Sequence, residues 1–306
     1  MKEITVEAPA TVANVVCGFD CLGFALDKPC DELTVRLIDE RVVRIRHLDD
    51  FDLPTEPEKN VAGAVLLSML ARIESPTGFE VTIKKGIKPG SGVGSSAACA
   101  AGAAYAANAL LGSPWTKAEL IEFARDGELV ACGARIADNV AACLYGGFTL
   151  VRATEPAADV VALEFPALFA TVIHPQIEIK TSEARALLRA EIPLSTAVRQ
   201  WGNVGALVAA LFRGDYELLA RSLVDDVAEP YRKKLIPLFD ELKASSIRAG
   251  ALGGGISGSG PSVFMLAENE TTADQVASAM REIYAPTGIA FNIYISPINA
   301  HGVVTK

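Results

Sequence analysis

The chain has 306 residues, of which 50% are hydrophobic, and its 28 basic and 37 acidic side chains give a formal net charge of −9. This length and hydrophobic content predict a folded globular protein with room for two domains and exclude an intrinsically disordered one. The acidic balance argues against general binding to nucleic acid or to anionic membranes, although a few local cations suffice to bind a small anion.

The beginning of the chain and its cysteines indicate the compartment. Residues 1–7 alternate charged and apolar side chains, as a strand does, and do not resemble a signal peptide. No apolar run is long enough to span a bilayer. The six cysteines show no zinc-binding spacing, so we expect free thiols. We therefore expect a cytoplasmic protein with neither a nucleic-acid nor a membrane partner.

The first half of the chain shows alternating strand and helix periodicities. Helix signals include a capping box at Thr116 and Glu119 and a stop at Gly146 and Gly147. In chain order we predict a strand at 2–8, a hairpin of strands 33–38 and 42–48, a helix at 60–73, a strand at 80–85, helices at 97–111, 116–130 and 135–144, and a strand at 148–152.

The segment 153–159 is the predicted linker and divides the chain into domains at 1–155 and 156–306. The second half again mixes strands with helices, so we predict two domains of the α+β class. The expected elements are strands at 169–174, 263–266 and 289–295, and helices at 182–188, 195–212, 216–224, 235–246 and 272–284.

A glycine-rich loop lies between the strand at 80–85 and the alanine-rich helix at 97–111. It reads Lys-Pro-Gly-Ser-Gly-Val-Gly-Ser-Ser-Ala-Ala over residues 88–98. Glycines let backbone N–H groups approach an anion, and a helix N-terminus adds partial positive charge. The loop fits neither the P-loop nor the G-x-G-x-x-G pattern. By itself it is equally compatible with a plain turn before a helix.

Two further clusters of turn residues lie far from this loop. Residues 253–261 hold five glycines and precede a strand, and residues 8–20 contain Asn14, Gly18 and Asp20. Each cluster alone is compatible with an ordinary turn. Because the two glycine clusters fall in different predicted domains, they favour a ligand bound between the domains.

Together the three clusters resemble the motifs of the GHMP kinase superfamily, which includes galactokinase, homoserine kinase and mevalonate kinase. The resemblance is greatest to the homoserine kinases, whose N-terminal P-A-S/T-x-A-N-x-x-x-G-F-D signature is similar to residues 9–20. It implies the two-domain GHMP kinase fold, with an N-terminal ribosomal-S5-domain-2-like domain and a C-terminal ferredoxin-like domain. Other matching segments are 60–63, 127–129, 137–140, 146–148, 181–185 and 230–237, so the resemblance covers essentially the whole chain.

The resemblance implies ATP-dependent phosphorylation of L-homoserine to O-phospho-L-homoserine, a step of threonine biosynthesis, by a homodimer that uses Mg²⁺. The hydroxyl of Ser96 and the carboxylate of Glu128 would bind Mg²⁺, which takes oxygen ligands. The expected ATP-binding residues are Lys88, Pro89, Gly90, Ser91, Gly92, Val93, Gly94, Ser95, Ser96, Ala97 and Ala98, with Gly258 and Ser259 from the second glycine cluster.

The expected acceptor has a carboxylate, an ammonium and a hydroxyl. Guanidinium groups match a carboxylate bidentately, so Arg185 and Arg232 are the carboxylate ligands that the resemblance implies. Asp20 would bind the ammonium. Asn14 and Thr181 would hydrogen-bond the amino-acid end or the reacting hydroxyl.

The catalytic base is the least defined role. Asp138 and Asn139 match the region where many superfamily members place an aspartate, and we expect both to orient the substrate, with a base role for Asp138 as the alternative. Homoserine kinases usually carry a histidine two residues before this pair, whereas this chain has Ile136. His47, His174 and His301 lie in no matching motif and are expected to be structural or surface residues.

Two alternatives stay open at the level of the sequence. One is another GHMP kinase that acts on a carboxylate-bearing alcohol similar to mevalonate or shikimate. The other is a non-catalytic protein that keeps the fold as a binding module, although the presence of both Ser96 and Glu128 argues against it.

Overall fold

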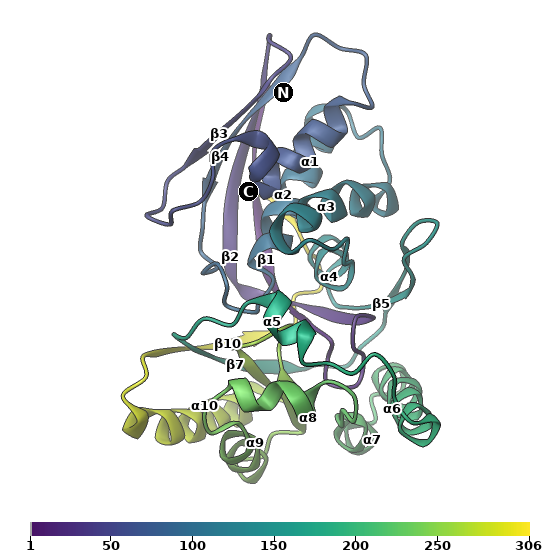
Figure 1. Cartoon of the computed structure of the whole chain (residues 1–306), viewed down its shortest axis with the longest axis vertical. Coiled ribbons are helices and arrows are strands. Elements are labelled where there is room, and N and C mark those ends of the chain that lie inside the picture. The colour runs from purple at the N-terminus through teal and green to yellow at the C-terminus, as the bar shows by residue number, and fades with distance from the viewer. Residues whose placement is uncertain (1) are drawn as a thin grey trace.

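The computed structural model describes residues 2–306 and contains two sheets (Figure 1). The first has seven strands in the order β11-β1-β2-β4-β3, and β5 pairs with β2 and with β6. Long antiparallel pairing of β1 with β2 forms its centre. Its strands are β1 (Glu3–Ala13), β2 (Leu22–Ile38), β3 (Val43–His47), β4 (Gly78–Lys84), β5 (Phe148–Ala153), β6 (Asp159–Leu163) and β11 (Val304–Thr305).

Four helices cover one face of this sheet (Figure 1). The central helix, α2, is almost entirely buried, and its small side chains let it approach the sheet closely. At Gly102, for example, a Cβ atom would lie 2.8 Å from Leu33 Cδ1. The four helices are α1 (Val61–Leu70), α2 (Ser95–Leu110), α3 (Lys117–Cys132) and α4 (Asp138–Tyr145).

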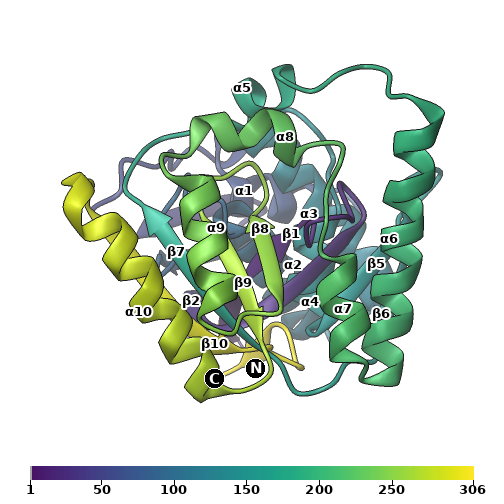
Figure 2. The same ribbon diagram turned by 90° about the horizontal axis from the view of Figure 1, so that it is seen from below.

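The second sheet has four antiparallel strands in the order β10-β7-β9-β8, flanked by α9 and α10 (Figure 2). This βαββαβ succession is that of a ferredoxin-like domain. Its strands are β7 (Phe169–Pro175), β8 (Gly253–Ile256), β9 (Val263–Ala267) and β10 (Phe291–Pro297); the helices of this half are α5 (Thr181–Ala186), α6 (Leu194–Arg213), α7 (Tyr216–Ser222), α8 (Glu229–Arg232), α9 (Phe239–Arg248) and α10 (Glu270–Tyr284).

Most of the predicted elements are present, but two connections differ. The strands at 33–38 and 42–48 form no hairpin, because β3 pairs in parallel with β4, which lies between β3 and β2. The segment 153–159 is no linker, since it connects the paired strands β5 and β6. The division at 155/156 stays a prediction; by sheet membership, both β6 and β11 belong with the first half.

Two motifs predicted as loops are partly strands. β1 continues to Ala13, and only then do Asn14, Val15 and Val16 take positive φ values of 71°, 40° and 62°. The three glycines at 253–255 lie in β8, where a Cβ at Gly254 would come within 2.0 Å of the Phe264 carbonyl oxygen. Within residues 2–306, no helix is long and apolar enough to cross a membrane.

Candidate functional site

A cavity of about 450 Å³ is lined by residues from both halves of the chain, and most of the predicted site residues converge on it. The loop after β1, the start of α2, α3, α4, α5, α8 and the loop after β8 all contribute to its walls. The predicted residues that line it are Asn14, Asp20, Pro89, Gly90, Gly92, Gly94, Ser95, Ser96, Glu128, Asp138, Asn139, Thr181, Arg185, Arg232, Gly258 and Ser259.

Five residues predicted to bind ATP do not line the cavity. Lys88 is exposed and its Nζ donates to Gln176 Oε1 at 2.5 Å. Ser91 and Val93 are buried on the side of the loop that faces away from the cavity, and the side chains of Ala97 and Ala98 belong to the hydrophobic core beneath α2. The loop turns at Gly90, Gly92 and Gly94, which have positive φ values, and Ala97 and Ala98 lie on the part of α2 that faces the core, so these side chains point away from the cavity.

The glycines of the 88–98 loop are required by its geometry. Gly90, Gly92 and Gly94 have φ values of 73°, 80° and 69°, a region that favours glycine. A Cβ on Gly94 would come within 2.0 Å of Thr11 Oγ1. Helix α2 then begins at Ser95 with no side-chain cap, which leaves its N-terminus, with its partial positive charge, available to an anion at the cavity wall.

The second glycine cluster, at residues 253–261, and the residue that follows it are hydrogen-bonded to this loop. Ser257 Oγ donates to the Gly92 carbonyl oxygen at 2.7 Å, and Ser262 Oγ donates to the Ser91 carbonyl oxygen at 2.6 Å. Asn14 Nδ2 donates to the Gly258 carbonyl oxygen at 2.9 Å, so the loop after β1 is joined to the same cluster. All three sequence clusters therefore meet at one place.

Glu128 supplies a buried carboxylate beside Ser96. Glu128 is 2% exposed, and within residues 2–306 its Oε1 atom has no hydrogen-bond partner. Burial raises the pKa of Glu128 to about 7, against the lowering effect of a hydrogen bond from Ser96, and the charge of Asp138 raises it further. A buried carboxylate oxygen without a partner, next to a hydroxyl, fits a hard divalent cation such as Mg²⁺.

Asp138 and Asn139 begin α4 with different surroundings. Asn139 Oδ1 accepts a hydrogen bond from Thr11 Oγ1 at 2.7 Å, which fixes the orientation of the amide. Asp138 Oδ1 accepts from the Asn139 backbone N–H at 2.9 Å. Burial raises the pKa of Asp138 to about 7, and the nearby charge of Asp20 adds to the effect.

Arg232 is a buried cation without a counter-ion. It is 4% exposed, and among the described residues no carboxylate lies within 4.0 Å of its guanidinium group. It donates only to the carbonyl oxygens of Ala184 and Gly258, at 3.2 and 3.0 Å, and lies over the ring of Phe19. Burial and the neighbouring Arg185 lower the pKa of Arg232. The environment therefore favours an anionic ligand at this end of the cavity.

Asp20 and Arg185, which were expected to bind different ends of the acceptor, are paired with each other. Arg185 donates to both carboxylate oxygens of Asp20 at 3.0 Å. Thr181 Oγ1 lies 3.3 Å from Ser259 Oγ, at the same end of the cavity. Both charged groups are about half exposed, which makes the pair weak enough to exchange partners.

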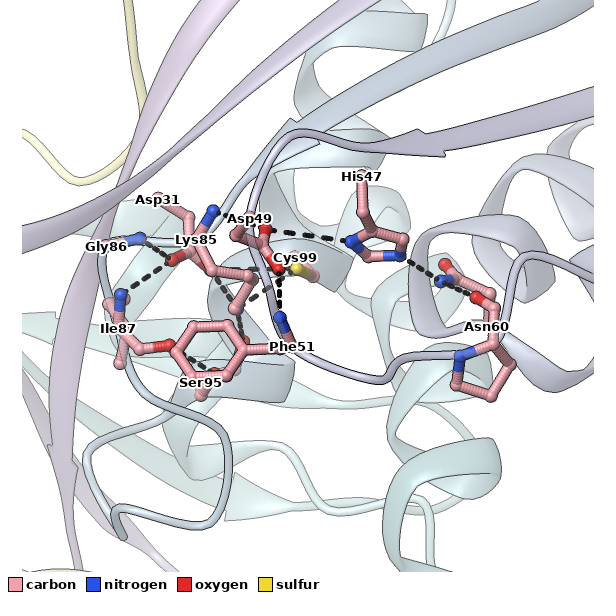
Figure 3. Close-up of polar contacts among 11 residues, drawn as sticks. Asp31, His47, Asp49, Phe51, Asn60, Lys85, Gly86, Ile87, Ser95 and Cys99 are labelled. Atoms are coloured by element: carbon pink, nitrogen blue, oxygen red, sulfur yellow. Dashed lines mark hydrogen bonds and ion pairs between the residues drawn. The ribbon is translucent and has the colours of Figure 1, made fainter.

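An ion pair that the motifs did not predict holds the base of the glycine loop (Figure 3). Lys85 and Asp31 are in contact with almost no solvent exposure. Asp31 Oδ1 accepts from the N–H groups of Gly86 and Ile87 at 2.9 Å, and Lys85 Nζ donates to the Ser95 carbonyl oxygen at 2.8 Å. The alternation offered a signal, since Asp31 shares the inward face of β2 with Leu33 and Val35.

The end of the cavity opposite Arg232 was also missed. The side chain of His47 is only 8% exposed and lines the cavity, although the sequence suggested a structural or surface residue. It lies beside Asn60, which caps α1 by accepting from the Gly63 N–H at 3.2 Å. The neighbouring residues that line this end are Lys59 and the apolar Leu53, Pro54 and Val61.

Comparison with known proteins agrees with this arrangement. Residues 60–147 match the family model of the GHMP kinases N terminal domain, and residues 207–286 match that of the GHMP kinases C terminal domain. The homoserine kinases of Chloroherpeton thalassium and Chlorobaculum tepidum are 45% and 47% identical to this chain; each comparison covers 99% of the chain, and 99% and 98% of the respective relative.

A solved structure supports the same assignment. The crystal structure of homoserine kinase from Cytophaga hutchinsonii superposes with a TM-score of 0.95 at 47% identity, and the match covers 100% of this chain and 98% of that one. Identity at this level over the full length, together with the two domain matches, shows that the chain belongs to the homoserine kinase family of the GHMP kinases.

Proposed function

We propose that this protein transfers the γ-phosphoryl group of ATP to the side-chain hydroxyl of L-homoserine, which yields O-phospho-L-homoserine for threonine biosynthesis. The observation that carries the proposal is the composition of one cavity. It joins an uncapped helix N-terminus and a buried, unpartnered carboxylate to a buried guanidinium group without a counter-ion. These three features favour phosphate, a divalent cation and a carboxylate, respectively, which an ATP-dependent amino-acid kinase would bring together.

The ATP phosphates would lie against the backbone of residues 90–96. Ser96 and Glu128 would hold Mg²⁺, which neutralises phosphate charge and helps to position the phosphates when it is bound. With the phosphates at the start of α2 and the charged acceptor groups on one side, the remaining end, at His47 and Asn60, is left for the nucleobase.

On binding, the acceptor would break the Asp20–Arg185 ion pair and form ion pairs with both residues. A zwitterionic amino acid can offer its ammonium to Asp20 and its carboxylate to Arg185 and Arg232, so that each charge keeps a partner. This exchange also provides Arg232 with the anion that the free protein lacks. The reacting hydroxyl would then extend past Asn14 and Thr181 toward the phosphates.

The chemical step depends on positioning. The acceptor hydroxyl oxygen attacks the γ-phosphorus in line, ADP departs, and the hydroxyl proton is released as the new phosphate ester forms. Asp138 and Asn139 would orient the acceptor, because Asn139 is already fixed by Thr11 and Asp138 lies beside it.

An acceptor screen tests the proposal. ADP release from MgATP should rise with L-homoserine and stay at the background rate with mevalonate, shikimate or galactose. Stimulation by another carboxylate-bearing alcohol alone would replace homoserine with that acceptor. No stimulation by any alcohol, with ADP binding intact, would favour a binding module.

Ile136 provides a second arm of the same screen. It lines the cavity where homoserine kinases usually carry a histidine. Ile136→His should lower the KM for L-homoserine if an imidazole there adds a hydrogen bond to the acceptor, and Ile136→Val is the matched control that adds none. An unchanged KM in Ile136→His would mean that the two arginines already supply the required contacts.

The proposal includes a cytoplasmic homodimer, for which α6 offers the contact surface. One face of this helix exposes Leu194 (73%), Val198, Trp201 (58%) and Phe212, and α6 lies at the edge of the molecule in Figure 2. Gly205, on the same face, has open space where a Cβ would be, so no contact within the chain requires a glycine there. The free cysteines fit a reducing compartment.

Light scattering after gel filtration tests the dimer. Trp201→Glu should convert dimers to monomers, whereas Val42→Glu, at an exposed apolar position in the first half of the chain, should not. A wild-type chain that is monomeric at tens of micromolar, or a Trp201→Glu variant that stays dimeric, would overturn this assignment.

A further inference from the structure

We propose that His47 is a positioning residue that holds the carboxamide of Asn60 in one orientation and thereby sets the preference of the site for adenine over guanine nucleotides. The inference rests on the proposed function, in that the cavity end at His47 receives the nucleobase. Figure 3 shows the contacts that carry it, in which His47 lies between Asp49 and Asn60.

The Asn60 side chain has nearly all its hydrogen-bonding capacity in use. Its Oδ1 accepts from the Gly63 N–H at 3.2 Å, and its Nδ2 donates to the Pro54 carbonyl oxygen at 2.7 Å. The same Nδ2 lies 3.2 Å from His47 Nε2. An amide nitrogen has two hydrogens and an amide oxygen has two lone pairs. One lone pair of Oδ1 is therefore the only capacity left for a ligand.

The contacts of Asn60 also determine the state of His47. Because Asn60 Nδ2 can only donate, His47 Nε2 must accept, and the ring proton of the neutral imidazole lies on Nδ1. Nδ1 faces Asp49 Oδ2 at 3.8 Å and has no hydrogen-bond partner within residues 2–306. A carboxylate on the Nδ1 side favours this tautomer.

Asp49 is itself held in place. Its Oδ2 accepts from the Lys85 backbone N–H at 3.0 Å, and its Oδ1 accepts from the Phe51 N–H at 3.2 Å (Figure 3). Lys85 also anchors the start of the glycine loop through Asp31. Asp49, His47 and Asn60 thus form a row that is joined by one contact of 3.8 Å and one hydrogen bond of 3.2 Å and that runs from the Lys85 backbone to the start of α1.

This arrangement discriminates between bases by their hydrogen-bond donors. A free lone pair on Asn60 Oδ1 accepts from an exocyclic amino group such as that of adenine, and it repels the oxygen that guanine carries at the same ring position. If the carboxamide turned over, Nδ2 would face the ligand and the preference would reverse. His47 Nε2 opposes this turn together with two backbone groups, because the amide oxygen would then face two acceptors, Nε2 and the Pro54 carbonyl oxygen, and Nδ2 would face the Gly63 N–H donor.

Two isosteric variants separate positioning from general packing. In His47→Gln the amide oxygen can take the place of Nε2 and still accept from Asn60, whereas in His47→Asn the shorter side chain reaches only the place of Nδ1. ADP and GDP binding to the full chain is measured by calorimetry with Mg²⁺ and without an acceptor. We expect His47→Asn to weaken ADP about tenfold and to narrow the ADP-to-GDP affinity ratio by a similar factor, and His47→Gln to stay within about threefold of wild type.

A cycle with Asn60→Asp makes the test independent of one variant's folding. The carboxylate that this substitution introduces keeps an oxygen for the Gly63 N–H but loses the donors to Pro54 and His47. If His47 acts through Asn60, adding His47→Asn to Asn60→Asp changes ADP affinity little, whereas additive losses overturn the proposal. Equal losses in His47→Gln and His47→Asn, or parallel losses of ADP and GDP, also overturn it. Since ADP binding needs no acceptor, failure of homoserine phosphorylation would not alter this result.

Discussion

Arg185 donates two hydrogen bonds of 3.0 Å to Asp20 and thereby joins α5 to the loop after β1 across 165 positions of sequence. The pair neutralises two groups whose charges match the two ends of an amino acid. It is half exposed, so solvent screening keeps its contribution to stability to at most about 1 kcal/mol. Under the proposed function, an acceptor that carries both charges would take the place of Arg185 beside Asp20 and of Asp20 beside Arg185.

Asp20→Asn should raise the KM for L-homoserine by about 10- to 100-fold, since the acceptor ammonium loses its carboxylate partner. The KM for ATP should change less than about twofold. Steady-state kinetics with each substrate varied in turn measure both values. Equal increases in the two constants would mean that Asp20 supports the cavity as a whole and does not bind the ammonium.

Arg232→Gln should raise the KM for L-homoserine by about 100-fold, because the acceptor carboxylate would lose a buried guanidinium group that has no counter-ion among residues 2–306. The comparison acceptor is 3-amino-1-propanol, which keeps the amine and hydroxyl but has no carboxylate. Its kcat/KM, low in the wild type, should not fall further in Arg232→Gln. A loss of kcat/KM of similar size with both acceptors would mean that Arg232 does not bind the acceptor carboxylate.

Glu128→Gln should reduce the dependence of nucleotide binding on Mg²⁺ and flatten the pH dependence of stability. Because the folded pKa of Glu128 is about 7, above its ordinary value of 4.5, the metal-free folded protein binds the extra proton between these values. The unfolding free energy of wild type should therefore fall as the pH rises from about 4.5 to about 7, by up to about 3 kcal/mol from this group.

Urea unfolding of both proteins at a series of pH values without Mg²⁺ measures this difference. Asp138 contributes in the same direction, since its pKa is also raised to about 7, so only the difference between variant and wild type reports on Glu128. Parallel curves for the two proteins would show that the carboxylate is already solvated or paired in the free protein.

Asp138→Asn should lower kcat only a few-fold, in keeping with a role in orientation. A general base typically contributes about 10²- to 10⁴-fold, so a loss of that size would assign the base to Asp138. The pH profile of kcat discriminates as well, because a base with a pKa near 7 would produce an acidic limb that Asp138→Asn removes. Retention of the same limb in the variant would exclude Asp138 as its source.

Lys85→Met should lower the unfolding free energy by about 3–5 kcal/mol, because it leaves the buried Asp31 carboxylate without its cation. Adding Asp31→Asn should recover about 1–3 kcal/mol, since an amide oxygen still accepts from the Gly86 and Ile87 N–H groups without carrying a charge. Denaturant unfolding at neutral pH provides the values. A double variant less stable than Lys85→Met would contradict the isolated-charge explanation.

The sequence predicted which residues line the cavity better than it predicted which of them are in contact with each other. The resemblance of short motifs to those of the GHMP kinases brought Asn14, Ser96, Glu128 and Asp138 together, and all four line the cavity, although their roles there stay predictions. The pairing of Asp20 with Arg185 was not predictable, since both residues were assigned by what they would bind and no local rule brings them together in the free protein.

The missed features have physical reasons as well. β3 was assigned to a hairpin because adjacent strands usually pair, but Gly78 lets β4 pass close to the turn before β3 and occupy the space beside β2; a Cβ there would lie 2.1 Å from the Glu40 carbonyl oxygen. His47 lay in no motif, and only the placement of β3 at the sheet edge next to α1 brings it to Asn60.

The fastening of the glycine loop to the second glycine cluster limits how this protein can open. Ser257 and Ser262 are fully buried, and both donate to carbonyl oxygens of the 88–98 loop, so separation of the two glycine clusters would break two buried hydrogen bonds. These bonds disfavour a hinge at that seam. The Asp20–Arg185 pair, in contrast, is half exposed, so under the proposed function the acceptor would exchange by a local rearrangement at α5 that leaves the contact between the two glycine clusters intact.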